Sequence, residues 1–269
     1  MITRSNHMAG RPGSMQSRVV LLALVAAAVA AYACSATPTT PNNPASPPNG
    51  GTPNTPGNVP AVKAGVTTLC KFGPGGRFAV TVDVTGANPS TRAVTVDDGA
   101  CVDVATVNPA SKDDVIVAIV ENAVNFAALD HIVMQQGEGE GRTITSNPAV
   151  SFEGTHGAVV TYYNNALVTL CKMGLAGTFQ FQVGAADAFH DLSLAAGQCA
   201  TIASIPPAAR ADDVIVTVRE NTSTSYRLDH VTLVLGDGDV NAPRTITGTT
   251  NVSFEGVHGG VVRFFNVAP

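Results

Sequence analysis

Charged side chains are scarce in this sequence. Asp, Glu, Lys and Arg make up 13% of the 269 residues, about half of the roughly 25% typical of globular proteins. The formal net charge is −5, so no basic surface is expected, which disfavours nucleic acid as a partner. Tryptophan is absent and aromatic residues make up 5% of the chain. No aromatic cluster therefore singles out a ligand.

A long helical period is also missing from residues 61–269. Short runs rich in Val, Ile and Thr follow one another, separated by turn-forming stretches such as GPGG, TGAN and VDDGA. This pattern predicts an all-β fold made of antiparallel, Ig-like β-sandwiches. The strands expected in the first half of this region are 76–84, 92–96, 101–107, 114–120, 129–134 and 159–163.

The same region is an internal duplication. The first copy contains TTLCK, DDVIVAIVEN, ALDHI and VSFEGTHGAVVTYYN, and the second contains VTLCK, DDVIVTVREN, RLDHV and VSFEGVHGGVVRFFN. The period of about a hundred residues is longer than the repeats of solenoids and propellers. We therefore predict two tandem domains of ordinary single-domain size, 61–164 and 165–269.

The N-terminal residues are typical of an export signal. Three arginines precede the apolar run 19–33, which is short for a membrane-spanning helix and suits the core of a signal peptide. We predict a signal peptide over residues 1–33, with either Met1 or Met15 as the true start. The protein is then exported.

Cys34 directly follows this run. Residues 31–34, AYAC, resemble a bacterial lipobox, whose cysteine is lipidated and becomes the mature N-terminus. Ordinary cleavage after Ala33 is the alternative, because residues 31–33 also form an A-x-A site. Cys34 is the odd one of five cysteines, and this favours a lipid anchor that binds the membrane. A lipoprotein of the cell envelope, on the outer surface or in the periplasm, is expected, with secretion as the alternative.

Residues 34–60 are expected to form a linker between this anchor and the first domain. The stretch 35–60 has eight prolines and no charged or large apolar side chain besides valine. Such a composition cannot bury enough surface to fold, and it behaves as a semi-extended spacer.

The other four cysteines are divided equally between the two copies. In an exported protein they are expected to form disulfides, and the duplication favours pairing within each copy, Cys70 with Cys101 and Cys171 with Cys199. Neither copy has a CxxC motif or a nearby Cys/His quartet. We therefore expect no metal and no other cofactor.

Three polar residues in each copy continue rows of apolar side chains. Because side chains alternate across a strand, a residue two positions from a buried one shares its face, and a charge buried there must be paired or neutralised. The chain has four lysines against eleven arginines. A desolvated lysine can lose its proton and act as a nucleophile, whereas arginine stays protonated. The six residues are Lys71, Glu121 and Asn164 in the first copy and Lys172, Glu220 and Asn266 in the second.

These residues belong to an ordered pattern of an early LxK, a later VxxxE and a terminal VxFxN-like motif. The motifs are Leu69-Lys71, Val117-Glu121 and Val160-Tyr162-Asn164 in the first copy, and Leu170-Lys172, Val216-Glu220 and Val262-Phe264-Asn266 in the second. With this pattern each copy resembles a prealbumin-like, Cna B-type (SpaA-like) domain of bacterial surface proteins. The resemblance implies an isopeptide bond between the lysine and the asparagine, with the glutamate transferring the proton. An uncrosslinked polar cluster of the same three residues is the alternative.

Other titratable residues suggest sites more weakly. His131 and His230 each follow an aspartate, and His156 and His258 each lie three residues after a glutamate, a spacing that zinc can use but that strand ends and turns explain better. The stretches 137–141 and 236–239 are acidic and glycine-rich, and Asp237, Asp239 and Asn241 imitate the opening of a calcium loop. Position 248 is glycine where that loop needs its glutamate, so a solvated turn is expected.

These features together predict a non-enzymatic structural or adhesion-type protein of the cell surface. No GxSxG nucleophile motif is present. The alternative is a carbohydrate- or protein-binding module that uses its variable loops for an unknown extracellular ligand. A metal-dependent enzyme would require histidines and carboxylates to converge in one cleft.

Overall fold

The computed structural model describes residues 59–111, 114–122, 126–207, 214–221, 223–236 and 243–269. The predicted signal peptide, Cys34 and the linker up to residue 58 lie outside the described residues, as do Asp237, Asp239 and Asn241. The described residues form an all-β fold, as predicted, with a short 3-10 turn, η3 (Gly256–His258), before the last strand. Within these ranges no helix is long and apolar enough to cross a membrane.

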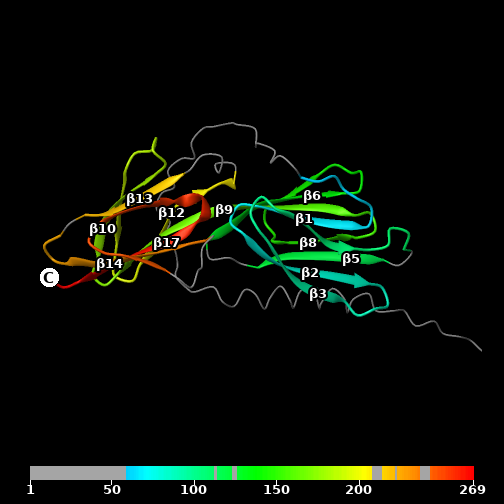
Figure 1. Ribbon diagram of the computed structural model, residues 1–269, viewed down its shortest axis with the longest axis horizontal. Helices are drawn as coiled ribbons and strands as arrows, with labels where there is room; N and C mark the ends of the chain where they lie inside the picture. Colours follow the sequence, from blue (N-terminus) through cyan, green and yellow to red (C-terminus); the bar gives the residue numbers. More distant parts are fainter. Residues whose placement is uncertain (1–58, 112–113, 123–125, 208–213, 222, 237–242) are drawn as a thin grey trace, which may run out of the picture. The chain divides into compact units, whose positions relative to one another are not determined.

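The strands follow the turn signals of the sequence (Figure 1). The first copy contains β1 (Val66–Phe72), β2 (Gly76–Val84), β3 (Ser90–Val96), β4 (Cys101–Thr106), β5 (Val115–Asn122), β6 (Ala127–Gln136), β7 (Arg142–Ile144), β8 (Ala149–Glu153) and the first half of β9 (Ala158–Met173). The second copy contains the rest of β9, then β10 (Gly177–Val183), β11 (His190–Leu194), β12 (Cys199–Ile205), β13 (Ile215–Glu220), β14 (Arg227–Leu235), β15 (Arg244–Ile246), β16 (Asn251–Glu255) and β17 (Gly260–Val267).

Each copy contributes a four-stranded sheet and part of a larger, shared sheet. The small sheets have the orders β3-β2-β5-β8 and β11-β10-β13-β16. The shared sheet has nine strands and follows the path β15-β14-β17-β9-β1-β4, with β6 and β12 also paired to β9. Buried residues of a small sheet and of the shared sheet meet in one hydrophobic core per copy. Two layers around such a core make each copy a β-sandwich.

Two ladders of the shared sheet are parallel, so the sandwiches are not antiparallel throughout. β1 pairs with β9 in parallel, and β9 pairs with β17 in parallel, while the other ladders between named strands are antiparallel. Parallel neighbours need a long crossover connection. Here the crossover is the remainder of the copy, because the first and last strands of each copy lie side by side.

The strand β9 has no break at the predicted border between residues 164 and 165. Its first half pairs with β1 and β6, and its second half pairs with β12 and β17. Tyr162 belongs to the core of the first copy and Ala166 to the core of the second. A single strand therefore contributes the last strand of one sandwich and the first strand of the next.

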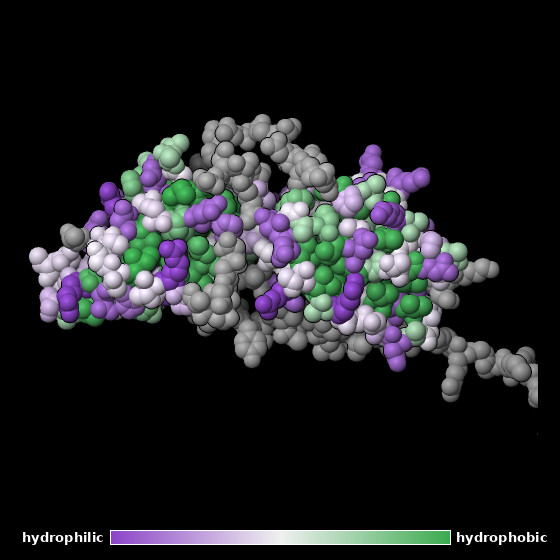
Figure 2. Space-filling view, in the orientation of Figure 1, coloured by the Kyte–Doolittle hydropathy of each residue, from purple (hydrophilic) through white to green (hydrophobic). Residues whose placement is uncertain are grey.

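Burial within the strands follows the expected period of two. In β5 the residues Val115, Val117, Ile119 and Glu121 are buried, while Ile116 between them is exposed. Elsewhere on the visible surface of the described strands, apolar residues are interspersed with hydrophilic ones (Figure 2). Charged side chains that are buried inside the sandwiches are therefore exceptions to this pattern.

Candidate functional site: two buried clusters of lysine, glutamate and asparagine

The first cluster brings together three residues from β1, β5 and β9. The Lys71 Nζ lies 3.7 Å from Glu121 Oε1, and Asn164 Nδ2 donates a 2.8 Å hydrogen bond to the same oxygen. Lys71 also donates to the backbone carbonyl of Phe72 at 3.2 Å. The exposed fractions are 0% for Lys71, 7% for Glu121 and 2% for Asn164. The amine and the carboxamide thus meet at one carboxylate oxygen inside the sandwich.

The second cluster repeats this arrangement on β9, β13 and β17. The Lys172 Nζ lies 3.1 Å from Glu220 Oε1, to which Asn266 Nδ2 donates at 2.9 Å. Lys172 also donates to the carbonyl of Met173 at 3.5 Å. All three side chains are buried. The second copy therefore repeats the contacts of the first cluster.

Sheet topology explains why residues so distant in sequence meet. β1 and β9 are parallel neighbours, so Lys71 near the end of one strand lies close to Asn164 on the other. Glu121 comes from the opposing sheet, where it pairs in register with Phe78 of β2. Each side chain continues the buried row of its strand.

Burial shifts the pKa of one group in each cluster toward its uncharged form. Desolvation raises the pKa of Glu121 above its ordinary value, and this outweighs the opposing effects of Lys71 and Asn164. In the second cluster desolvation lowers the pKa of Lys172, against the opposing contact with Glu220. An uncharged lysine amine is a nucleophile, and a protonated carboxyl group is a proton donor.

The carboxamide oxygens in both clusters have unused acceptor capacity. Asn164 Oδ1 and Asn266 Oδ1 are buried and accept no hydrogen bond from the described residues. Leaving a buried polar atom without a partner costs free energy. Rotating each carboxamide by half a turn would present this oxygen to the glutamate, and a protonated Glu121 or Glu220 could then donate to it.

Two glycines beside the clusters were missed by sequence reasoning. A Cβ on Gly76 would lie 2.6 Å from Glu121 Oε1, and one on Gly177 would lie 2.5 Å from Glu220 Oε1. Both contacts are closer than real Cβ atoms allow, so these positions must lack a side chain. The signal was present in the sequence as a repeated G-x-F, Gly76-Arg77-Phe78 and Gly177-Thr178-Phe179.

Aromatic rings close the other side of each cluster. Phe78 and Tyr162 meet edge to face at 5.0 Å between ring centroids, and Phe179 and Phe264 do so at 5.2 Å. The second cluster has an additional ring, because Lys172 Nζ lies 5.3 Å from the ring centroid of Tyr226. The corresponding residue of the first copy is Ala127. Apolar rings at these positions contribute to the burial of the charged groups.

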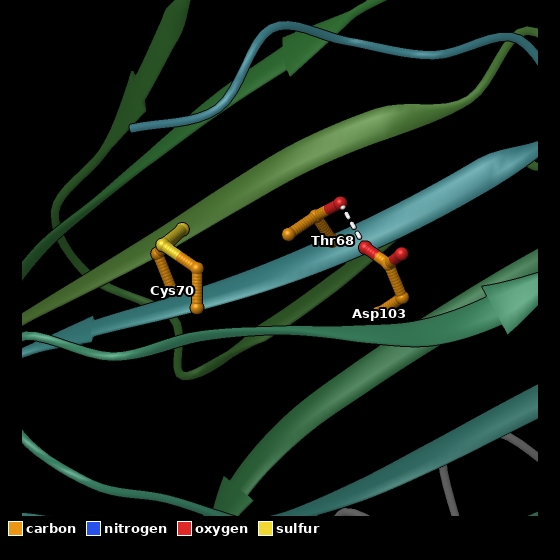
Figure 3. The surroundings of a disulfide bond; sticks show 4 residues. Thr68, Cys70 and Asp103 are labelled. Carbon is orange, nitrogen blue, oxygen red and sulfur yellow. Dashed lines mark hydrogen bonds between the residues drawn. A yellow bond between two sulfur atoms is a disulfide. The ribbon is translucent and has the colours of Figure 1, made fainter. Parts of the chain in front are cut away.

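The disulfides predicted from the cysteine arithmetic are present. Cys70 bonds to Cys101, and Cys171 bonds to Cys199. In the first copy the bond joins β1 to its neighbour β4, close to a 2.7 Å hydrogen bond from Thr68 to Asp103 (Figure 3). Cys70 and Cys171 immediately precede the lysines of the two clusters.

The histidines of the described ranges do not converge on a metal centre. His131 and His230 contact the preceding aspartates at 2.6 and 2.7 Å and stack on Tyr163 and Phe265. His258 lies 3.5 Å from Glu255. Across the described ranges no three His, Cys, Asp or Glu residues come close enough to hold a metal ion.

One hollow of about 350 Å³ lies in the first sandwich, lined by β2, β3 and β4. Arg92 from β3 lines it and donates to the backbone carbonyls of Asp103 and Val104. Strands line this hollow, and the variable loops invoked for a binding module do not. Ligand binding stays a prediction from the sequence.

Comparisons with known proteins add little beyond this geometry. No family model matches the chain, and no curated protein matches it in sequence. Among solved structures, a major pilin of Streptococcus pyogenes is 13% identical with a TM-score of 0.32, over 76% of this chain and 99% of the pilin. The S. pyogenes T-13 major pilin is 12% identical with a TM-score of 0.30, over 78% and 98%. Similarity this low carries no argument about function.

Proposed function

We propose that the chain is an exported structural protein of the cell envelope whose two sandwiches are each fastened by an intramolecular lysine–asparagine amide bond. The observation that carries the proposal is the duplicated cluster, in which an amine, a carboxyl group and a carboxamide are buried together. The disulfides support export, because such bonds persist in oxidising compartments. The protein then performs no turnover chemistry, and its reaction occurs once in each domain.

The bond-forming step requires an uncharged lysine amine and a protonated glutamate. Burial favours the protonated form of Glu121 and the uncharged form of Lys172. The uncharged Lys71 Nζ attacks Asn164 Cγ, and the protonated Glu121 donates a hydrogen bond to the carboxamide oxygen. A bond forms between Nζ and Cγ, and the bond between Cγ and Nδ2 breaks. Glu121 accepts one proton from the lysine nitrogen and delivers one to Nδ2, so ammonia leaves and Glu121 ends as it began. Lys172, Glu220 and Asn266 follow the same scheme.

Burial also explains why such a reaction would be favourable. Two ionisable groups inside a sandwich are costly, and their mutual attraction offsets that cost only in part. Conversion of the amine and the carboxamide to an amide removes one ionisable group from the core. The product also ties the first strand of each copy to its last strand.

Peptide mapping of the purified protein tests this proposal. Digestion should release one branched peptide joining Lys71 to Asn164 and another joining Lys172 to Asn266. The substitution Lys71→Ala should abolish the first branched peptide and leave the second, whereas Lys63→Ala, which removes an exposed lysine, should leave both. Linear peptides containing unmodified Lys71 and Lys172 in the parent protein would refute the crosslinks.

A further inference from the structure

The position of each disulfide relative to its lysine suggests a role beyond general stability. Cys70 and Cys101 are direct partners in the β1–β4 ladder, and Cys171 and Cys199 are direct partners in the β9–β12 ladder. Each cysteine pair closes the end of its ladder, one residue before the lysine. The arrangement recurs although the surrounding turns differ in sequence, GA before Cys101 and GQ before Cys199.

The backbone of each lysine is held by the turn that the disulfide closes. The Lys71 N–H donates to the Ala100 carbonyl at 3.0 Å, and its own carbonyl accepts from Gly99 at 2.8 Å. In the second copy Lys172 donates to Gln198 at 2.8 Å and accepts from Gly197 at 2.8 Å. Both hydrogen bonds exist only while the ladder keeps its register.

Without a covalent bond, the pairing register of each ladder could shift. Both ladders contain an irregularity, between Thr67 and Thr68 in the first copy and between Thr201 and Ala203 in the second. A slip of one residue moves every side chain of a strand to the opposite face. The lysine would thereby leave its glutamate and asparagine for the opposite face of its strand.

The disulfide also encloses the strand that supports the glutamate. The segment between Cys70 and Cys101 contains β2, whose Phe78 pairs with Glu121. The segment between Cys171 and Cys199 contains β10, whose Phe179 pairs with Glu220. Closing this segment restricts the lysine relative to the glutamate as well as relative to the neighbouring strand.

We infer that the four cysteines are positioning residues, whose disulfides fix the register that turns Lys71 and Lys172 toward their glutamates and asparagines. This inference rests on the proposed crosslinks for its kinetic consequence. Disulfide formation releases two protons and two electrons to an external disulfide oxidant such as glutathione disulfide. The crosslink would therefore form faster after the chain has reached an oxidising compartment.

The duplication supplies an internal control for the test. The full chain with Cys70→Ser and Cys101→Ser, synthesised in a glutathione redox buffer, is sampled over time, and the two branched peptides are quantified. Misplacement of the lysine should slow the Lys71–Asn164 crosslink by about tenfold or more, while the Lys172–Asn266 crosslink keeps its parent rate. The pair Cys171→Ser and Cys199→Ser should reverse the pattern.

Folding is measured in the same samples, so that lost stability is not mistaken for lost positioning. Rates are expressed per folded molecule, and the folded fraction is measured as the fraction that resists proteolysis. If the variant sandwich unfolds, trimethylamine N-oxide is added, since this osmolyte favours burial without restoring the disulfide. A crosslink that stays slow in the folded variant supports the inference. A crosslink that forms at the parent rate in the folded variant overturns it.

A second readout keeps the inference separate from the crosslinks. If the parent protein contains no branched peptide, the proposed function fails. In that case the folded parent and variant proteins are treated with an acetylating ester. Lys71 should then be protected in the parent and acetylated in the Cys70→Ser, Cys101→Ser variant, with exposed Lys63 as the reference. Equal protection of Lys71 in both proteins would show that the disulfide does not position it.

Discussion

At the scale of single residues, each cluster holds three polar groups where apolar side chains would pack without cost. Lys71 and Lys172 are among the largest fully buried side chains of the described residues. Removing one partner of such a pair typically destabilises a protein by about 3–5 kcal/mol, because the other charge is left uncompensated. Burying such groups also costs desolvation free energy that their mutual attraction offsets only in part, so both clusters are candidates for a chemical role.

Glycine at position 76 is predicted to be required for the first cluster. Gly76→Ala would push a Cβ into Glu121 Oε1 and the ring of Phe78. We expect a loss of about 1–3 kcal/mol of stability and a smaller yield of the Lys71–Asn164 crosslink. Gly75→Ala is the matched control, since its Cβ would meet its nearest neighbour at an ordinary 3.8 Å. Denaturant unfolding and peptide mapping provide the readouts. Equal behaviour of the two variants would count against this steric requirement.

The raised pKa of Glu121 gives a signed pH dependence when no crosslink is present. In Asn164→Ala, folding favours the protonated carboxyl group, whose ordinary pKa is 4.5. The stability contributed by Glu121 is then fully present below pH 4.5 and is lost as the pH rises through the higher pKa of the folded state. Denaturant unfolding across this range should show the loss in Asn164→Ala and not in Glu121→Gln/Asn164→Ala. Parallel curves for the two variants would contradict it.

Strand parity predicts which polar residues enter the core, but not how closely they approach. The alternation around Lys71, Glu121 and Asn164 is a local property of each strand, so the sequence contains it. The distances between them depend on the pairing of β1 with β9 and on the spacing of two sheets. The need for glycine at position 76 arises from Glu121 on the neighbouring strand β5 and from Phe78 on its own strand. In the sequence it was visible only as an unexplained repeat.

At the scale of elements, the strand β9 is the least predictable part of the fold. The sequence predicts a strand over 159–163 and a domain border after residue 164, whereas β9 continues to Met173. Apolar side chains alternate in the same phase along both halves of β9, and no Gly or Pro lies at the junction. The parallel pairing of β9 with β1 and β17 was also hidden, because a strand pattern contains no information about direction. Most antiparallel strands were predicted from the sequence because turn-forming residues lie at their ends.

The alternation along β5 makes a direct prediction about its two faces. Ile119→Ala removes a fully buried side chain from the first core and should cost about 2–5 kcal/mol. Ile116→Ala, three residues away on the same strand with 37% of its surface exposed, should change stability by no more than about 0.5 kcal/mol. Thermal or denaturant unfolding distinguishes them. Similar losses at both positions would mean that the face assignment of β5 is wrong.

At the scale of the whole molecule, the parts are proposed to act in series. In this proposal a signal peptide would direct export, a lipid on Cys34 would anchor the mature chain, and the proline-rich linker would separate the anchor from the sandwiches. The disulfides and the proposed crosslinks would then make the sandwiches resistant to unfolding. This order explains why the folded part contains covalent bonds between its strands and why the composition of the linker does not favour folding.

Lipidation of Cys34 predicts where the protein is found after cell fractionation. The parent should incorporate labelled fatty acid and remain with the membranes, while Cys34→Ala should lose the label and leave the membrane fraction. Cys70→Ser serves as a control that removes a different cysteine without touching the anchor. An unlabelled parent whose mature N-terminus is an unmodified Cys34 would indicate ordinary cleavage instead.

The intact mass of the mature protein tests the crosslinks most directly. The mass should be lower by two molecules of ammonia than the mass calculated for the mature sequence with both disulfides and its N-terminal lipid. Lys71→Ala and Lys172→Ala should each show a deficit of one ammonia relative to their own sequences, and the double variant should show none. A parent protein whose mass equals this calculated mass, with no ammonia lost, would contradict the proposal that its domains are fastened by lysine–asparagine bonds.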